Sequence, residues 1–318
     1  MTATTEYDRF GPWIDEVTSP DDVPRLYRDH PLDLDAARLV LKVPRNIARR
    51  DATADMDLYD HLLVVDASRL TVLSRRVAER ARRGAPPAPT GYDVRTVPLT
   101  RVVAVQESVD LLDGRLAIST DDGSTLTVRF NGSARTQVTR LVDVLREGAV
   151  AGEPTAVGRA LDAAGRAAAP CLLDPGADDL ALVADVTEVV RANPDLAPWT
   201  CHGRRRATVR SAGVAGLVRR VAHAFSPATL QGAVVAGDGT AVEVLGRSAW
   251  VTRGQTPQHS ASRLVLPLSR LDAVALTPHP LYADATQVEF TLGAAVATIV
   301  VPTGSPLESV VATAARAG

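Results

Sequence analysis

The feature that most constrains the fold of this chain is a repeated segment. The first copy opens with Val-Pro-Leu-Thr-Arg at residues 97–101, and the second opens with Leu-Pro-Leu-Ser-Arg at residues 266–270. In each copy valine-rich, β-prone segments follow, then a terminal helix introduced by Ser133 or Ser305. A shared order of strand, strand, strand and helix predicts duplication of one small domain. The repeat predicts an architecture and identifies neither a ligand nor a reaction.

Length and composition set the outer limits. A chain of 318 residues is long enough for two compact domains and a connector. A hydrophobic content of 46% and a mean hydropathy of +0.03 are typical of a globular protein. The net charge of −2 gives no overall reason to expect nucleic acid or membrane as a partner. Lys42 is the only lysine, an arginine bias typical of a GC-rich genome such as an actinobacterium's.

The patterns predict an α+β protein in four parts. These are an irregular N-terminal arm (1–36), a first domain (37–149), a helical connector (150–226) and a second domain (227–318). The first domain is expected to have strands near 38–43, 61–65, 69–74, 95–106, 115–120 and 125–130, then a helix at 134–147.

The second domain repeats this order. Its last helix begins with the capping sequence Ser305-Pro306-Leu307-Glu308. Its strands are expected near 230–236, 241–245, 249–253, 263–276, 286–292 and 296–301, and the connector helices at 154–169, 178–192 and 207–225. The last connector helix is basic and amphipathic, and we expect it to fold back on the acidic helix before it rather than to lie on a membrane.

Each copy resembles the pleckstrin-homology (PH) superfold. VVDASRLTVLSRR and VPLTRVVAVQES, within residues 38–148, are similar to segments of bacterial PH-like domains, and the second copy is similar through LPLSRLDAV. FGPWIDEV and VPRNIARRDATADMDLYDHLL resemble an uncharacterised bacterial family built on this domain. The resemblance implies two antiparallel β-barrels or sandwiches, each capped by its C-terminal helix. It implies a fold more than a function, because such barrels have unrelated roles.

An arginine-rich segment at 75–83 is the first candidate site. It contains five arginines against one glutamate, and three prolines follow by residue 89, so we expect an exposed loop. Such a loop can contact an anionic membrane, although a merely solvated loop is the alternative. No aromatic residue is interleaved to stack nucleic-acid bases. The candidates for anion or membrane contact are Arg75, Arg76, Arg80, Arg82 and Arg83.

A second basic group lies in the loop at 45–60, where eukaryotic PH domains often hold lipid phosphates. Its arginines are accompanied by four aspartates, which cancel the positive charge that a phosphate site needs. We therefore expect a local network of arginine and aspartate that orders the loop. Its candidate members are Arg45, Arg49 and Arg50.

Signatures of catalysis are not found in the sequence. It has no G-x-S-x-G, Walker or G-x-G-x-x-G motif, and its six histidines show no metal-ligand spacing. We expect no catalytic residue, metal, cofactor or small-molecule ligand. Cys171 and Cys201 are expected to be free thiols. With no signal peptide or membrane-spanning run, a cytoplasmic location is expected.

These observations favour a non-catalytic binding or scaffold protein. We expect it to act through protein–protein contacts, including self-association through open sheet edges. Two alternatives remain: peripheral binding to an anionic membrane through residues 75–83, and an enzyme with a site between its domains. Nucleic acid is not an expected partner.

Overall fold

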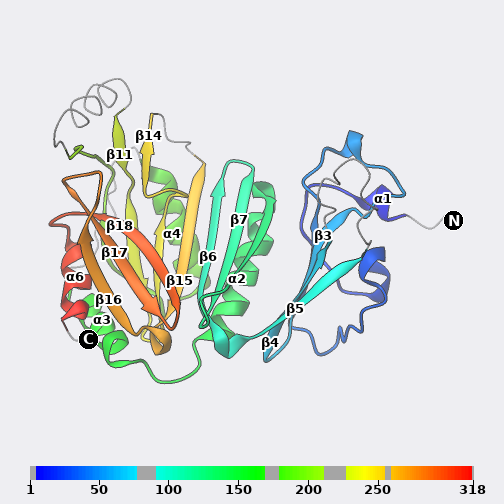
Figure 1. Ribbon diagram of the computed structural model, residues 1–318, viewed down its shortest axis with the longest axis horizontal. Helices are drawn as coiled ribbons and strands as arrows, with labels where there is room; N and C mark the ends of the chain where they lie inside the picture. Colours follow the sequence, from blue (N-terminus) through cyan, green and yellow to red (C-terminus); the bar gives the residue numbers. More distant parts are fainter. Residues whose placement is uncertain (1–4, 77–90, 169–178, 211–226, 255–258, 317–318) are drawn as a thin grey trace, which may run out of the picture. The chain divides into compact units, whose positions relative to one another are not determined.

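The computed structural model describes residues 5–76, 91–168, 179–210, 227–254 and 259–316 (Figure 1). This part of the chain is α+β and built mainly from antiparallel strands, as predicted. Each of its four sheets has two end strands, so no sheet of the described residues closes into a barrel. Packing divides the chain into unit 1 (Met1–Arg101, Leu112–Leu116 and Val128–Ala149) and unit 2 (Val102–Leu111, Ala117–Thr127 and Val150–Gly318).

Unit 1 contains a five-stranded antiparallel sheet in the order β1-β2-β3-β4-β5. The strands predicted at 38–43, 61–65 and 69–74 are confirmed as β2, β3 and β4. The five strands are β1 (Asp15–Glu16), β2 (Leu39–Pro44), β3 (Tyr59–Val65), β4 (Arg69–Arg75) and β5 (Tyr92–Pro98).

The N-terminal arm packs on one face of this sheet. Phe10 and Tyr27 are buried in one cluster with Leu62 of β3 and Leu73 of β4. The Tyr27 hydroxyl donates to the carbonyl oxygen of Tyr59 (3.2 Å). Besides β1, the described residues of the arm form three short helical turns, α1 (Glu6–Arg9), η1 (Pro20–Asp22) and η2 (Arg25–Tyr27). The arm thus supplies part of the core of unit 1.

Both Pro-Leu-x-Arg segments form 3₁₀ turns, so the long strands predicted at 95–106 and 263–276 are wrong. The first breaks into β5 and β6 (Val102–Asp110) around η4 (Leu99–Arg101). The second breaks into β15 (Ser260–Pro267) and β16 (Ala273–Pro278) around η7 (Leu268–Arg270). The strand before each turn, β5 or β15, ends at a proline, which has no N–H to continue the hydrogen bonding of a sheet.

After each turn the two repeats have the same order of three strands and an α-helix. In the first, η4 and β6 are followed by β7 (Asp113–Thr120), β8 (Thr125–Asn131), η5 (Gly132–Ala134) and α2 (Arg135–Ala149). In the second, η7 and β16 are followed by β17 (Ala285–Leu292), β18 (Ala295–Pro302) and α6 (Pro306–Ala315).

A seven-stranded sheet joins strands from the two repeats, in the order β8-β7-β6-β15-β13-β12-β9. Its central pairing is between β6 and β15, which are antiparallel and place Arg263 opposite Glu107. The remaining strands of this sheet are β9 (Ala197–His202), β12 (Ala233–Gly237) and β13 (Ala241–Gly246). A small sheet contains β10 (Arg205–Arg206), β11 (Ala228–Leu230) and β14 (Val251–Arg253).

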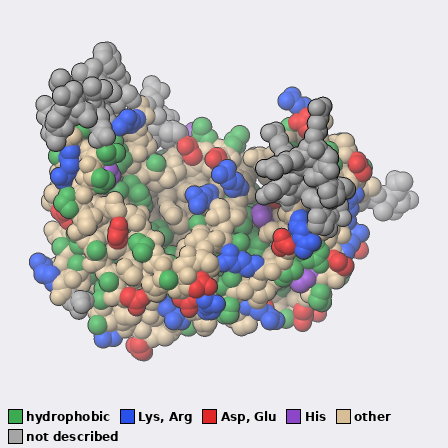
Figure 2. Space-filling model, viewed as in Figure 1, with side chains coloured by type: hydrophobic (Ala, Val, Ile, Leu, Met, Phe, Trp, Pro, Cys, Tyr) green, Lys and Arg blue, Asp and Glu red, His purple; other side chains and the backbone are tan. Residues whose placement is uncertain are grey.

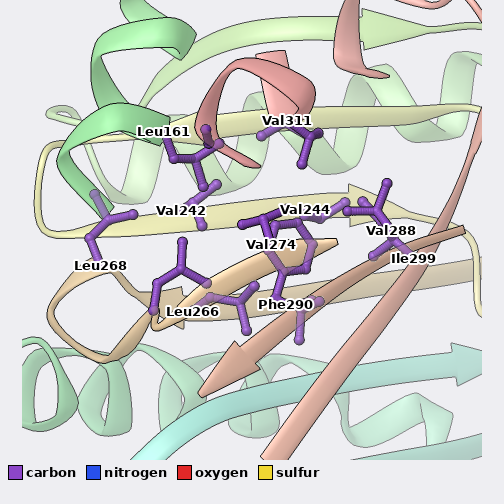
Figure 3. Close-up of a cluster of buried hydrophobic side chains, with 14 of the residues drawn as sticks. Leu161, Val242, Val244, Leu266, Leu268, Val274, Val288, Phe290, Ile299 and Val311 are labelled. Atoms are coloured by element: carbon purple, nitrogen blue, oxygen red, sulfur yellow. The ribbon is translucent and has the colours of Figure 1, made fainter. Parts of the chain in front are cut away.

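The core of unit 2 lies between β13 and β15, the three-stranded sheet β16-β17-β18 and two helices, α3 (Ala156–Ala167) and α6 (Figure 3). Valine, leucine and isoleucine dominate it, as the low aromatic content requires. Figure 3 shows Val242, Val244 and Leu266 of the large sheet facing Val288 and Phe290 of β17.

Among the described residues of the connector, the helices are α3 and α4 (Leu180–Ala192). Helices predicted at 154–169 and 178–192 are confirmed as α3 and α4. Strand β9 follows, which the sequence did not predict, and its Trp199 is buried between Gly165 of α3 and Gly237 of β12. Of the helix predicted at 207–225, residues 207–210 are not helical, and residues 211–226 lie outside the described part.

Cys201 of β9 is disulfide-bonded, so the prediction of free thiols is wrong. The other cysteine of the chain, Cys171, lies outside the described residues. Sequence spacing could not show this bond, because disulfide formation depends on the distance between two Cα atoms in the folded chain.

Candidate interaction edge

The candidate functional site is the free edge of β5 in unit 1. β5 is the last strand of the five-stranded sheet and pairs with β4 on one side only, among the described residues. The register places Tyr92 opposite Arg75 and Val97 opposite Leu70. An end strand presents a row of backbone groups to whatever lies beyond it.

Two hydrogen bonds reveal which residues of β5 face β4. The Arg76 N–H donates to the Gly91 carbonyl (2.9 Å), and the Leu99 N–H donates to the Ser68 carbonyl (2.8 Å). Gly91 and Leu99 therefore lie in hydrogen-bonded pairs with β4 at either end of β5. Because such pairs alternate along an antiparallel ladder, the odd-numbered residues from 91 to 99 bond to β4.

The even-numbered residues of β5 consequently point their backbone groups to the free edge. Tyr92, Val94 and Thr96 each present an N–H and a C=O there, while Pro98 presents only a C=O. The Val94 residue is 49% exposed. The edge therefore combines outward backbone N–H and C=O groups with the exposed apolar side chain of Val94 at its centre.

The side chains beside this edge hold the strand in place. The Tyr92 ring packs edge-on against Tyr27, with 5.3 Å between ring centroids. Its hydroxyl donates to the Asp29 carboxylate (2.8 Å). At the centre, Asp93 accepts a hydrogen bond from Arg76 (2.7 Å) while its side chain remains 71% exposed. The edge is thus anchored to the core of unit 1 at one end and open to solvent in its middle.

The structure pairs the first two candidate arginines of the 75–83 segment with carboxylates. Arg75 contacts Asp60 of β3 (2.6 Å) and is largely buried, and Arg76 contacts Asp93. Arg80, Arg82 and Arg83 lie outside the described residues. Two of the five arginines that were candidates for membrane contact, Arg75 and Arg76, are therefore paired with carboxylates of unit 1.

The loop candidates Arg45, Arg49 and Arg50 bind mainly backbone carbonyls. Arg45 donates to the carbonyl of Asp57 (3.3 Å). Arg49, in η3 (Arg49–Asp51), donates to the carbonyls of Asp8 and Phe10. Arg50 is exposed, with its Nε 3.8 Å from Asp51. The three arginines do not converge on one point. Their contacts tie the loop to itself and to the N-terminal arm.

Sequence reasoning missed a buried polar cluster at the start of α4. The Asp179 carboxylate is fully buried, and its Oδ1 accepts hydrogen bonds from Arg247 (3.1 Å) and Arg204 (3.3 Å). Asp179 Oδ2 and His202 Nε2 are buried without a hydrogen-bond partner. Burial lowers the pKa of His202 to about 4, so its ring is neutral near pH 7. No motif marked these residues, because they come from separate elements.

A second buried charge group lies in the seven-stranded sheet. Arg263 of β15 donates two hydrogen bonds to Glu243 of β13, at 2.7 Å and 3.1 Å. Glu107, opposite Arg263 on β6, is also buried. The two carboxylates and one guanidinium lie on one face of three neighbouring strands, β6, β15 and β13.

Two pockets in the described part of the chain differ in their chemistry. One of about 720 Å³ lies in the N-terminal arm, where Arg28 and His30 are mixed with Asp33 and Asp35. Another of about 450 Å³ lies between α3 and α6 and is mostly apolar. The described residues contain no group of three His, Cys, Asp or Glu side chains that could hold a metal ion.

Basic and acidic side chains are interspersed on the face shown in Figure 2. None of the described helices has both the length and the apolar character needed to cross a bilayer. No family model, curated protein or solved structure matches this chain. The free edge of β5 is therefore the feature of the described residues that best supports a function.

Proposed function

We propose that this protein is a non-catalytic binding or scaffold protein that acts through protein–protein contacts at the edge of β5. The observation that carries the proposal is the row of outward backbone groups at Tyr92, Val94 and Thr96, with Val94 exposed between them. A partner strand would satisfy these groups with main-chain hydrogen bonds, which provide affinity, while side-chain contacts provide specificity.

The tandem PH-like architecture is part of this proposal. Its support is the shared order of a 3₁₀ turn, three strands and a helix after Pro98 and after Pro267. PH-like domains leave sheet edges open, which suits strand addition. A cytoplasmic location also belongs to the proposal. The disulfide of Cys201 counts against this part of the proposal, because cytoplasmic thiols are normally kept reduced. The redox state of the cysteines in the native host therefore tests it.

The test uses a proline substitution at the free edge. Val94→Pro removes the outward N–H without removing a hydrogen bond to β4, and Val94→Ala is the matched control that keeps this N–H. We expect the wild type and Val94→Ala to retain the same bound protein in a pull-down from the native host, and Val94→Pro to lose it. Equal retention by all three would contradict the proposal. A thermal unfolding curve for each variant verifies that it is folded.

Membrane binding through the arginine-rich segment is the second candidate. It now depends on Arg80, Arg82 and Arg83, because Arg75 and Arg76 contact carboxylates. Sedimentation with anionic vesicles at low and high salt tests it. Salt-sensitive binding that is lost on changing these three arginines to glutamine would support it, and no binding at low salt would exclude it.

A further inference from the structure

We propose that the strand added to β5 is the β5 strand of a second copy of this chain, antiparallel and centred on Val94. This inference depends on the proposed function and names its partner. Three independent properties of residues 92–96 carry it: the hydrogen-bonding pattern, the charges and the exposed valine.

The hydrogen-bonding pattern suits a two-fold axis at Val94. The outward backbone groups belong to Tyr92, Val94 and Thr96, which are symmetric about Val94. In an antiparallel pair centred there, Val94 lies opposite its own equivalent and Tyr92 lies opposite Thr96. Each of these positions is a hydrogen-bonded pair that exchanges two bonds, so no outward N–H between 92 and 96 is left without an acceptor.

The charges beside the axis are complementary. The same register places Asp93 of one copy opposite Arg95 of the other, and the two-fold axis makes this contact twice. These are the non-hydrogen-bonded positions, where opposite Cα atoms are only about 4.5 Å apart. Oppositely charged residues directly across an antiparallel pair stabilise it, whereas like charges destabilise it. The exposure of Asp93, at 71%, leaves its carboxylate accessible to a second chain.

The exposed apolar surface lies at the same point. Val94 is 49% exposed, and the axis would bring two copies of its side chain together on one face of the joined sheet. The end strand β8 differs, because its only charged residue is Arg129 and it offers no oppositely charged pair across a two-fold axis. Residues 92–96 are therefore self-complementary in backbone, charge and hydrophobicity. An interface between two such short strands is small, so we expect a reversible, concentration-dependent dimer.

A charge exchange tests this register. Asp93→Arg places like charges opposite each other in a homodimer, and so does Arg95→Asp. In sedimentation velocity on the full chain, we expect the wild type to shift toward dimer with concentration and each variant alone to remain monomeric. An equimolar mixture of the two variants restores both attractive contacts and should form a heterodimer.

One control separates the interface from contacts within the chain. Arg76→Gln breaks the same intramolecular ion pair, Arg76–Asp93, that Asp93→Arg breaks. It leaves residues 92–96 unchanged, so it should dimerise like the wild type. If Arg76→Gln loses the dimer but the mixture of Asp93→Arg and Arg95→Asp forms one, the mixture still supports the register, because only paired charges across the interface can restore it. A mixture that stays monomeric while the wild type dimerises would overturn it.

The outcomes also distinguish this inference from the proposed function. A wild type that is monomeric at every concentration, but loses a different bound protein through Val94→Pro, overturns self-pairing and keeps strand addition. A wild type that is monomeric, with binding insensitive to Val94→Pro, overturns both.

Discussion

The carbonyl oxygen of Leu268 lies against the Cα of Gly158, where any side chain would overlap it. The same oxygen accepts a hydrogen bond from the Thr155 N–H (3.1 Å), so the start of α3 is fastened to η7. In the first repeat, the equivalent leucine, Leu99, packs by its side chain against Gly148 of α2. Each Pro-Leu turn thus meets a helix at a glycine, but through backbone in one case and side chain in the other.

This difference predicts unequal costs for two alanine substitutions. Gly158→Ala should destabilise unit 2 by about 1–3 kcal/mol, because the Leu268 carbonyl cannot rotate away. Gly148→Ala should cost less, because the Leu99 side chain can adjust and alanine favours a helix by about 1 kcal/mol over glycine. Urea unfolding of the two variants checks the order, and an equal or reversed ranking would contradict it.

Removing the buried arginine of the seven-stranded sheet should be strongly destabilising. Arg263→Met removes the two hydrogen bonds that Arg263 donates to the buried Glu243, at an expected cost of about 3–5 kcal/mol in the free energy of unfolding. Arg253→Met, at an exposed position of β14, is the matched control and should change it by less than about 0.5 kcal/mol. Similar values for the two variants would show that the buried pair does not stabilise the sheet.

The neutral histidine at the end of β9 predicts a loss of stability in acid. Burial lowers the pKa of His202 in the folded chain to about 4, whereas an unfolded histidine titrates near pH 6.5. The unfolded state therefore binds more protons between these values. The contribution of His202 is fully present above about pH 6.5 and is lost as the pH falls toward 4, by about 3 kcal/mol in total.

The measurement compares urea unfolding at pH 7 and pH 4.5. The wild type should lose more stability over this interval than His202→Gln, which has no ring to protonate. His259→Gln, at an exposed position, should behave like the wild type. Burial also lowers the pKa of His61, so part of the stability lost in acid comes from His61 in every variant. The contribution of His202 is therefore read from the difference between the wild type and His202→Gln.

The disulfide at Cys201 predicts that the oxidised protein has no reactive thiol. Alkylation under denaturing conditions should modify neither cysteine before reduction and both of them after it. Reduction should lower the free energy of unfolding by about 2–4 kcal/mol. Alkylation of unreduced protein taken directly from its native host would contradict the bond and favour the reduced cytoplasm.

Local patterns were sufficient to predict several elements. β2, β3 and β4 follow from runs of β-branched and apolar residues, and α6 follows from its Ser305–Glu308 cap, whose Ser305 Oγ accepts from the Glu308 N–H (3.2 Å). The duplicated order of strands and helix follows from the repeat itself. In each case the information lies within a few residues, so no distant partner was needed to read it.

Contacts between distant segments decided the rest. Whether Pro98 and Pro267 continue a strand or start a 3₁₀ turn depends on the pairing beyond them, and β9 becomes a strand because β12 offers it an edge. The candidate site has the same origin. The sequence by itself determined the self-complementary order of charges around Val94, but only the pairing of β5 with β4 decided which backbone groups face outward. The physical reason is that a shift of one residue in register would exchange the bonded and the free side of every position in the strand.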